Sequence, residues 1–400
     1  MSAPAGMRGS TRPSGLAIVF KGAAFAASLF VAGPLTAMSQ GPIQPADLIP
    51  VQFADLSGWA TDQHADALVA FKRFCGSGAP SNANRGPFQL SKDHRQALCK
   101  AAQASKDARS FFETHFAPFQ VREPGFVTGY FEPEVVASRE KTAEFNVPLL
   151  KKPDGLVHVP AKARPSGWPT HLTHGRRING QVTEMPDRSA IMDGALDGEG
   201  LELVWLRNPI DAYFIHVQGS ARLKLVDGST MRVGYAGKNG HPYTGIARLL
   251  VQRGEGAPED FTMSGLRRWL EQNPDDRDPL FKENRSYIFF REVTEAEPDE
   301  GPIGAAGLPL VPGRSLAIDD SAMPYGVPVF VSAEFEDPQK PGQQYRRLMV
   351  ADDTGSAIRG QSRGDIFVGS GDDAGRIAGE IRHGATFTVL LPRRSTGLGN

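Results

Sequence analysis

Three aspartates near the C-terminal end of the chain adjoin short apolar runs, glycines and small polar residues. Asp319 follows the run 315–318, Asp353 lies just beyond the run 348–351, and Asp365 precedes the run 366–368. An aspartate at a strand end most often caps a turn by accepting local backbone N–H bonds, which is the simpler interpretation. Three of them beside β-type segments also indicate carboxylates gathered at one rim of a small barrel. That arrangement would suit acid catalysis on a glycoside or a peptide.

Asp365 is the strongest candidate for a general acid among the three. The apolar run 366–368 follows it directly. A carboxyl group at an apolar barrel rim keeps its proton to higher pH because burial disfavours the charged form, and a general acid needs that proton. Asp353 and Asp319 either add like charge that raises the pKa of Asp365 further or act as fixed anions that orient sugar hydroxyl groups. The sequence leaves both roles open.

Composition and residue spacing argue against several other chemistries. The chain has 400 residues, 22% of them charged, and a net charge of −1, so no basic footprint for nucleic acid is visible. Residues 353–356 read Asp-Thr-Gly-Ser, as in an aspartic protease, but that chemistry needs a second Asp-Thr-Gly and the sequence contains one. No histidine pair has the i, i+4 spacing of a zinc helix. We expect neither a metal nor a cofactor.

The N-terminal segment has the pattern of a secretory signal peptide, predicted to cover residues 1–39. Arg8, Arg12 and Lys21 form a positive leader without acidic residues, and the apolar run 22–31 follows. That run is short for a membrane span, although a retained N-terminal anchor is the alternative. Loss of the segment removes three positive charges and takes the net charge from −1 to −4. We therefore expect an exported, periplasmic protein.

Cys75 and Cys99 are the only cysteines of the chain. Export to an oxidising compartment makes a disulfide between them the expected state. Cys75 ends a helix predicted over 60–75, and Cys99 lies on a second helix predicted to begin after Ser91 as its N-cap. A third helix is predicted over 108–116, with aromatic residues that we assign to the core.

The remainder of the chain alternates between β and helical patterns. Residues 126–133 predict a strand, on which Tyr130 and Glu132 share one face. Residues 137–200 are polar and rich in proline. A small antiparallel β unit is predicted next, from the runs 202–206, 212–220, 221–226 and 230–235, with a hairpin turn at 226–229. Helices are predicted over 246–253 and 266–272. Strands resume over 284–290 and continue to Leu391.

This order of elements predicts a mainly β protein built on one barrel with flanking helices. The barrel would be made from both ends of the chain, residues 40–133 and 286–400. A smaller β domain, residues 134–285, would interrupt it. Because binding sites commonly form at domain interfaces, we expect the site between the two.

The C-terminal segments resemble the three-aspartate domain of the membrane-bound lytic murein transglycosylase A family. The resembling segments are 314–319, 353–360 and 365–369. Other landmarks of that family match in the same order: 129–133, 217–220, Asn239 with Tyr243, 284–290 and 307–311. The tail pattern alone is shared with other wall-active proteins, whereas the full set, spanning roughly residues 120–392, is specific.

The resemblance implies a double-psi β-barrel, interrupted by a smaller inserted β-barrel-like domain, with a glycan groove between them. It implies cleavage of the MurNAc–GlcNAc β-1,4 bond of peptidoglycan, with 1,6-anhydro-MurNAc ends, because the sugar's own 6-hydroxyl attacks in place of water. Asp365 matches the family's acid, and Asp353 and Asp319 match its supporting carboxylates. The residues implied to contact the substrate are Tyr130, Glu132, Gln218, Ser220, Asn239 and Tyr243.

Two features depart from the family pattern. Members are often lipoproteins, but no lipobox cysteine is present here, so any association with the outer membrane would need another anchor. Glu132 stands where some relatives are expected to carry a smaller hydroxyl residue. Two alternative functions stay open: a peptidoglycan-binding protein without catalysis, and a peptidoglycan hydrolase in which Glu132 would have to serve as the second carboxylate. Expected partners are glycan strands, with cell-wall synthesis or division proteins as candidates, and we expect a monomer.

Overall fold

The computed structural model describes residues 41–76, 86–297 and 299–393 of the chain. The predicted signal peptide, residues 1–39, lies outside the described residues. Within the described ranges, no helix has the length and apolar character needed to cross a membrane.

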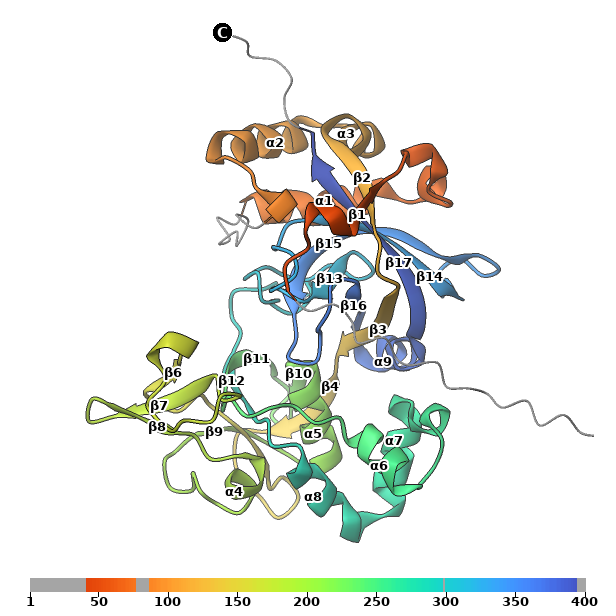
Figure 1. The fold of residues 1–400 in the computed structure, drawn as a ribbon. Coiled ribbons are helices and arrows are strands. Elements are labelled where there is room, and N and C mark those ends of the chain that lie inside the picture. Colours follow the sequence, from red (N-terminus) through yellow and green to blue (C-terminus); the bar gives the residue numbers. More distant parts are fainter. Residues whose placement is uncertain (1–40, 77–85, 298, 394–400) are drawn as a thin grey trace, which may run out of the picture. The chain divides into compact units, whose positions relative to one another are not determined.

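Eight strands form a sheet in the order β1-β2-β17-β14-β15-β13-β16-β3, and β17 also pairs with β3 (Figure 1). Because β17 pairs with both β14 and β3, the six strands from β17 to β3 close into a barrel, which confirms the predicted mainly β fold class. The strands are β1 (Leu48–Pro50), β2 (Phe116–Val121), β3 (Gly125–Glu132), β13 (Ser315–Ile318), β14 (Pro328–Glu336), β15 (Gln344–Thr354), β16 (Arg363–Ser370) and β17 (Arg382–Pro392).

The barrel strands read as continuous apolar runs because both of their faces are covered. Leu348, Met349 and Val350 follow one another on β15 and are all fully buried. One side packs inside the barrel, and helix α1 (His64–Gly76) lies against β15 on the other. A helix near the C-terminal end, α9 (Gly371–Glu380), covers β3 and β16 in the same way.

The N-terminal helices form one cluster over the barrel, as predicted. The second helix, α2 (Lys92–Ala104), begins after Ser91, whose hydroxyl accepts the His94 N–H at 3.1 Å. The third helix is α3 (Ala108–His115). A disulfide joins Cys75 of α1 to Cys99 of α2. Of the aromatic residues assigned to the core, Phe111, Phe112 and Phe116 are buried in this cluster, and Phe119 is partly buried against the barrel core.

A second sheet lies between β3 and β13 in the chain, with the strand order β12-β11-β10-β4-β9-β5. Its strands are β4 (Glu134–Ser138), β5 (Val147–Leu150), β9 (Glu202–Leu206), β10 (Ser220–Leu225), β11 (Thr230–Lys238) and β12 (Ile288–Glu292). A bridge between Lys151 and Phe290 joins its two edges, which makes the sheet barrel-like. The antiparallel pairing of β10 with β11 confirms the predicted hairpin. Strand β12 belongs to this sheet, although the expected boundary at residue 286 placed it with the first barrel.

Smaller elements surround the second sheet. A three-stranded sheet contains β6 (Leu156–His158), β7 (His174–Ile178) and β8 (Gln181–Glu184), within the segment that the sequence marks only as polar and proline-rich. The helices are α4 (Arg188–Met192), α5 (Pro209–Gln218), α6 (Ile246–Arg253), α7 (Met263–Gln272) and α8 (Pro274–Glu283).

The strand prediction for residues 212–218 is wrong, because they form the second half of helix α5. Asn208 caps this helix by accepting the Ile210 N–H at 2.8 Å, and Pro209 occupies its first turn. Gly219 ends it with a φ of 86°, a left-handed conformation that favours glycine. These start and stop signals can be read from the sequence. The residues between them are almost all apolar, so the pattern shows no helical period. Helix α9 was likewise not predicted.

Candidate active site

Two of the three aspartates lie on one rung of the barrel. Across neighbouring strands, Asp353 on β15 pairs with Ala317 on β13, Ala317 pairs with Asp365 on β16, and Asp365 pairs with Thr128 on β3. Two strand spacings separate the aspartates, about 9.5 Å between backbones. Residues that share a rung point to the same face, so both carboxylates face the same side of the barrel wall.

A β-bulge brings Asp353 onto this rung. Leu316 pairs with Ala351 and the next residue, Ala317, pairs with Asp353, so Asp352 is an extra residue on β15. Bulges of this kind re-aim a side chain and are common beside active sites. Without the extra residue, Asp352 would face Ala317 and Asp353 would lie one position further along the strand.

Asp365 has the environment of a carboxyl group that can act as an acid. Its Oδ1 accepts a hydrogen bond from the Thr128 hydroxyl at 2.6 Å. The Thr128 oxygen in turn accepts a hydrogen bond from Arg363 Nη2 at 2.7 Å, so the guanidinium acts on Asp365 through the threonine. Burial raises the pKa of Asp365 to about 6, with the charge of Asp353 in the same direction, against the lowering effects of Arg363 and Thr128.

Asp353 is held by two donors. The Tyr130 hydroxyl donates to its Oδ2 at 2.7 Å, and the Ala305 backbone N–H donates to its Oδ1 at 2.8 Å. Burial raises the pKa of Asp353 in spite of these hydrogen bonds, which act to lower it. Burial also raises the pKa of Tyr130 well above its usual value, so this hydroxyl keeps its proton and acts as a donor.

Asp319 anchors the loop that follows β15 and does not contact Asp365. Its carboxylate accepts hydrogen bonds from the Gly360 N–H at 2.9 Å, from Arg359 at 3.1 Å, and from the Ser321 hydroxyl and N–H at 2.7 and 3.0 Å. Burial acts to raise the pKa of Asp319, but these donors outweigh it and the pKa is lowered. Asp319 therefore holds the loop between Asp353 and Asp365.

Glu132 does not face the substrate as the resemblance implied. Its side chain is fully buried, and its two oxygens lie 2.7 Å from Arg222 Nε and 3.1 Å from Arg232 Nε. The Ser370 hydroxyl also donates to it at 2.8 Å. Two arginines from the second sheet and one serine of the barrel therefore surround the carboxylate and connect the two sheets. The sequence could not show these arginines, because β10 and β11 follow Glu132 only after about ninety residues.

Two further residues of the implied binding set are buried. Asn239 is fully buried; its amide donates to the Pro186 and Arg285 carbonyls and accepts the Tyr287 N–H at 3.0 Å. Ser220 is 7% exposed at the start of β10. The amide of Asn239 is satisfied inside the protein, so we correct that assignment, whereas substrate contact by Ser220 stays a prediction.

The other implied binding residues lie near the aspartates or at the junction of the two sheets. Tyr130 contacts Asp353, as described. Tyr243 is 36% exposed, and burial together with the charge of Asp365 raises its pKa, while Arg188 acts to lower it. Gln218, at the end of α5, accepts the Phe131 N–H at 3.0 Å through its side-chain oxygen and so holds the end of β3.

Sequence analysis missed three residues that shape this site: Thr128, Arg363 and Asp352. Thr128 could have been identified from the sequence, because side chains alternate along a strand and residue 128 therefore lies on the same face as Tyr130. Asp352 is 3% exposed; burial raises its pKa well above the usual range, and Ser315 donates to it at 2.6 Å. Nothing local marks Asp352 as the bulge residue, since the bulge depends on the register with β13.

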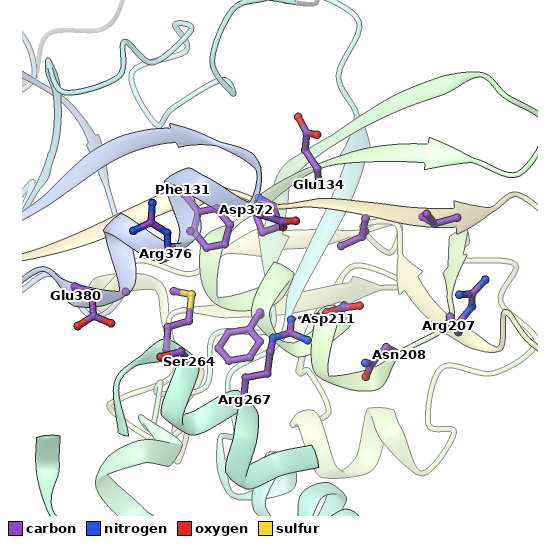
Figure 2. A pocket seen from close by; sticks show the side chains of 17 residues that line it. Phe131, Glu134, Arg207, Asn208, Asp211, Ser264, Arg267, Asp372, Arg376 and Glu380 are labelled. Carbon is purple, nitrogen blue, oxygen red and sulfur yellow. Dashed lines mark hydrogen bonds and ion pairs between the residues drawn. The ribbon is translucent and has the colours of Figure 1, made fainter. Parts of the chain in front are cut away.

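A cavity of about 590 Å³ lies where the end of β3 meets the second sheet and its helices (Figure 2). Phe131 lines it, and on a strand Phe131 points away from the face of Tyr130. Strand β4, the residues just before α5, and the helices α5, α7 and α9 form the other walls. Arg267 of α7 donates to Asp211 of α5 at 2.5 Å inside the cavity (Figure 2). Asp365 does not line this cavity. Among the described residues, no group of three His, Cys, Asp or Glu side chains is arranged to hold a metal ion.

The chain matches two families over the segments that form this site. Residues 126–291 match the family described as the MltA specific insert domain, and residues 314–391 match the 3D domain. The first match contains the second sheet with β3, and the second contains all three aspartates. These matches identify the protein as a chain with an MltA-type insert domain followed by a 3D domain.

Individual relatives agree with this class. Membrane-bound lytic murein transglycosylase A of Escherichia coli K12 is 33% identical over 278 residues, covering 68% of this chain and 67% of the relative. A crystal structure of membrane-bound lytic murein transglycosylase from Agrobacterium tumefaciens is 39% identical, with a TM-score of 0.81, over 87% of this chain and 98% of that one. Escherichia coli MltA with bound chitohexaose is 26% identical, with a TM-score of 0.64, over 89% and 97%. The chain belongs to the membrane-bound lytic murein transglycosylase A family and is a lytic transglycosylase acting on peptidoglycan.

Proposed function

We propose that this enzyme cleaves the MurNAc–GlcNAc β-1,4 bond with Asp365 as its single general acid and leaves a 1,6-anhydro-MurNAc end. The observation that carries the proposal is the setting of Asp365. Burial raises its pKa to about 6, and a threonine hydroxyl, not a cation, contacts its carboxyl group directly. A carboxyl group in this state can donate a proton near neutral pH and take one back.

The reaction balances with one carboxyl group. Protonated Asp365 gives its proton to the glycosidic oxygen as the bond between that oxygen and the MurNAc anomeric carbon breaks. The MurNAc 6-hydroxyl then forms a new bond to the same carbon and loses its proton to the Asp365 carboxylate, which restores the acid. No water enters, and the attacking hydroxyl benefits from its fixed position in the same sugar.

The neighbouring residues support this cycle in separate ways. Asp353 raises the pKa of Asp365 by its charge, after burial as the main cause, and Tyr130 holds Asp353 in place. Asp319 fixes the loop between them through the Gly360 N–H. We assign substrate contacts to Tyr130 and Tyr243; the exposed part of Tyr243 and its electrostatic coupling to Asp365 support that assignment.

We also propose that the chain works as two parts around this site. The predicted division assigns residues 40–133 and 286–400 to the part that carries the acid and residues 134–285 to the part that binds along the glycan, and we move the second boundary to follow β12. Because β12 belongs to the second sheet, we place the point where the chain returns to the barrel after Glu292. We further propose an exported, periplasmic protein that acts on glycan strands, as the leader sequence indicates.

The hydrolase alternative needs a second carboxylate to activate water or attack the sugar. Glu132, the candidate from the sequence, is buried against two arginines. Asp353 is the other carboxylate on the Asp365 rung, but the Tyr130 hydroxyl and the Ala305 N–H donate to its two oxygens, which leaves them less available to a water molecule or a sugar carbon.

Mass spectrometry of the products tests the proposal. Purified protein is incubated with peptidoglycan sacculi, and the soluble fragments are weighed. Anhydro-muropeptides, each lighter by one water than a reducing-end fragment, are expected from the wild-type chain and not from Asp365→Asn. Reducing-end products would establish the hydrolase. Bound but intact sacculi would leave a protein that binds the wall without cleaving it.

A further inference from the structure

Lys238 connects the second sheet to the loop that follows Asp353. It is the last residue of β11, and its Nζ donates to the Ser356 hydroxyl at 3.2 Å. Ser356 lies in the loop whose other end Asp319 anchors through Gly360. The ammonium group of Lys238 therefore lies at the loop that follows Asp353 by a few residues, but comes from the other sheet.

The charge of Lys238 is not balanced by a carboxylate. Within the described residues, Lys238 forms no ion pair, and its one hydrogen bond goes to a neutral hydroxyl. Arg359, on the same loop, is already paired with Asp319 and Asp320 at 3.1 and 3.7 Å. An ammonium group has three N–H donors, so two remain for another partner.

The charged and titratable groups around Lys238 are His174, Arg359 and Asp320, and Asp320 is already paired with Arg359 at 3.7 Å. The backbone of His174 packs tightly against Gly240, two residues beyond Lys238, and the ring of His174 lies 5.2 Å from that of His158. Burial, with the charges of Lys238 and His158, lowers the pKa of His174 to about 4, so this ring is neutral at pH 7. Burial and then Arg359 lower the pKa of Lys238, with Asp320 acting in the opposite direction. A half-buried cation without an anion is costly to maintain unless a ligand supplies the anion.

We propose that Lys238 binds a carboxylate carried by the lactyl arm of a MurNAc residue, so that the site recognises peptidoglycan over a neutral glycan. The sugar rings are uncharged, and the anions of the polymer lie on this arm. The anion is either the bare lactyl carboxylate or a carboxylate of the attached stem peptide. The inference rests on the proposed function, because it needs a glycan strand bound across the rung of Asp365.

Binding to the full chain carrying Asp365→Asn tests the inference, since the ligands are then not consumed. Three ligands are compared: chitohexaose, which has no carboxylate; glycan strands with stem peptides; and the same strands after an amidase has removed the peptides and left the lactyl carboxylate. The chain with Lys238 should bind a carboxylate-bearing ligand about 10-fold more tightly than chitohexaose, as one charge-assisted hydrogen bond provides.

The variants separate a binding role from a structural one. Lys238→Met should abolish the preference, and Lys238→Arg should retain most of it. Lys224→Met is the matched control, because it removes an exposed lysine of the same sheet that is paired with Glu134. Ser356→Ala removes the contact between the sheets and leaves the cation, so the preference should persist.

Each outcome decides the question. Tighter binding of the amidase-treated strands alone assigns the anion to the lactyl carboxylate, tighter binding of the peptide-bearing strands alone assigns it to the stem, and tighter binding of both shows that Lys238 accepts either carboxylate. Equal weakening of all three ligands by Lys238→Met, or loss of the preference in Ser356→Ala, would overturn the inference and leave a structural contact. If the Asp365→Asn chain shows the binding preference but the wild-type chain releases no anhydro product, the inference is retained and the proposed reaction is rejected. If no ligand binds, both are rejected.

Discussion

The strand pair β3 and β16 holds two carboxylates in matching settings with different roles. At one position Asp365 on β16 pairs with Thr128 on β3, and at another Glu132 on β3 pairs with Ser370 on β16. In both cases the cross-strand hydroxyl donates to the carboxylate, at 2.6 and 2.8 Å.

The nearby arginines make the difference. Two arginines of the second sheet lie directly against Glu132, with N–O distances of 2.7 and 3.1 Å. Arg363, two residues before Asp365, instead donates to Thr128. Glu132 is therefore a structural anion between two sheets, whereas Asp365 has a pKa of about 6. The comparison teaches that direct contact with cations, not the hydroxyl partner, decides which carboxylate is available for acid chemistry.

Removal of the acid should have the largest effect. Asp365→Asn keeps the shape and the hydrogen bond from Thr128 but cannot donate a proton, so kcat should fall by about 1,000-fold. The rate of anhydro-product release measures this, with the melting temperature as the control for folding. A loss below about 10-fold would show that another group supplies the proton.

Glu132→Gln should reduce stability and not the acid step. It leaves Arg222 and Arg232 without their carboxylate, and breaking a buried ion pair in this way costs about 3 kcal/mol. Urea unfolding measures the loss. Glu134→Gln is the control, because that carboxylate pairs with the exposed Lys224 and should cost less than about 1 kcal/mol. A full loss of activity in a stably folded Glu132→Gln would contradict the distinction between the two carboxylates.

Arg363→Met should shift the pH dependence of catalysis upward. A general acid works while protonated, so activity should fall as the pH rises through the Asp365 pKa of about 6. The Arg363 charge lowers that pKa, and its removal should move the fall to higher pH by about one unit. The pH profile of kcat/KM measures the shift. Arg376→Met, on the exposed face of α9, is the control and should leave the pH profile unchanged. An unchanged profile or a downward shift would show that Arg363 does not lower the pKa of Asp365.

Tyr130→Phe should shift the same profile slightly in the opposite direction. The Tyr130 hydrogen bond lowers the pKa of Asp353, so without it Asp353 takes up a proton more readily. The negative charge near Asp365 then decreases, and its pKa should fall by about half a unit. An unchanged profile with a raised KM would instead assign Tyr130 to substrate contact alone.

Much of the fold follows from local patterns in the sequence. The hairpin of β10 and β11, the helices α1 to α3 and the apolar barrel strands each have a period or a cap that can be read directly. Helix α5 was mistaken for a strand because its residues are apolar on almost every side, which removes the period of 3.6. Helix α9 was missed because its sequence is rich in glycine; Gly375 and Gly379 allow close packing on Phe131 and Met263, contacts that only the folded chain creates.

The sequence by itself determined which residue types could do the chemistry: an aspartate before an apolar strand, two more aspartates beside glycines, and a tyrosine two residues after a threonine. Local sequence is sufficient for this, because apolar runs and turn residues specify where strands begin and end. Only the tertiary structure decided the roles, by aligning Asp353 with Asp365 through a bulge and by bringing two arginines to Glu132. The physical reason is that burial and nearby charge set the role of a carboxylate, and both come from strands distant in the chain.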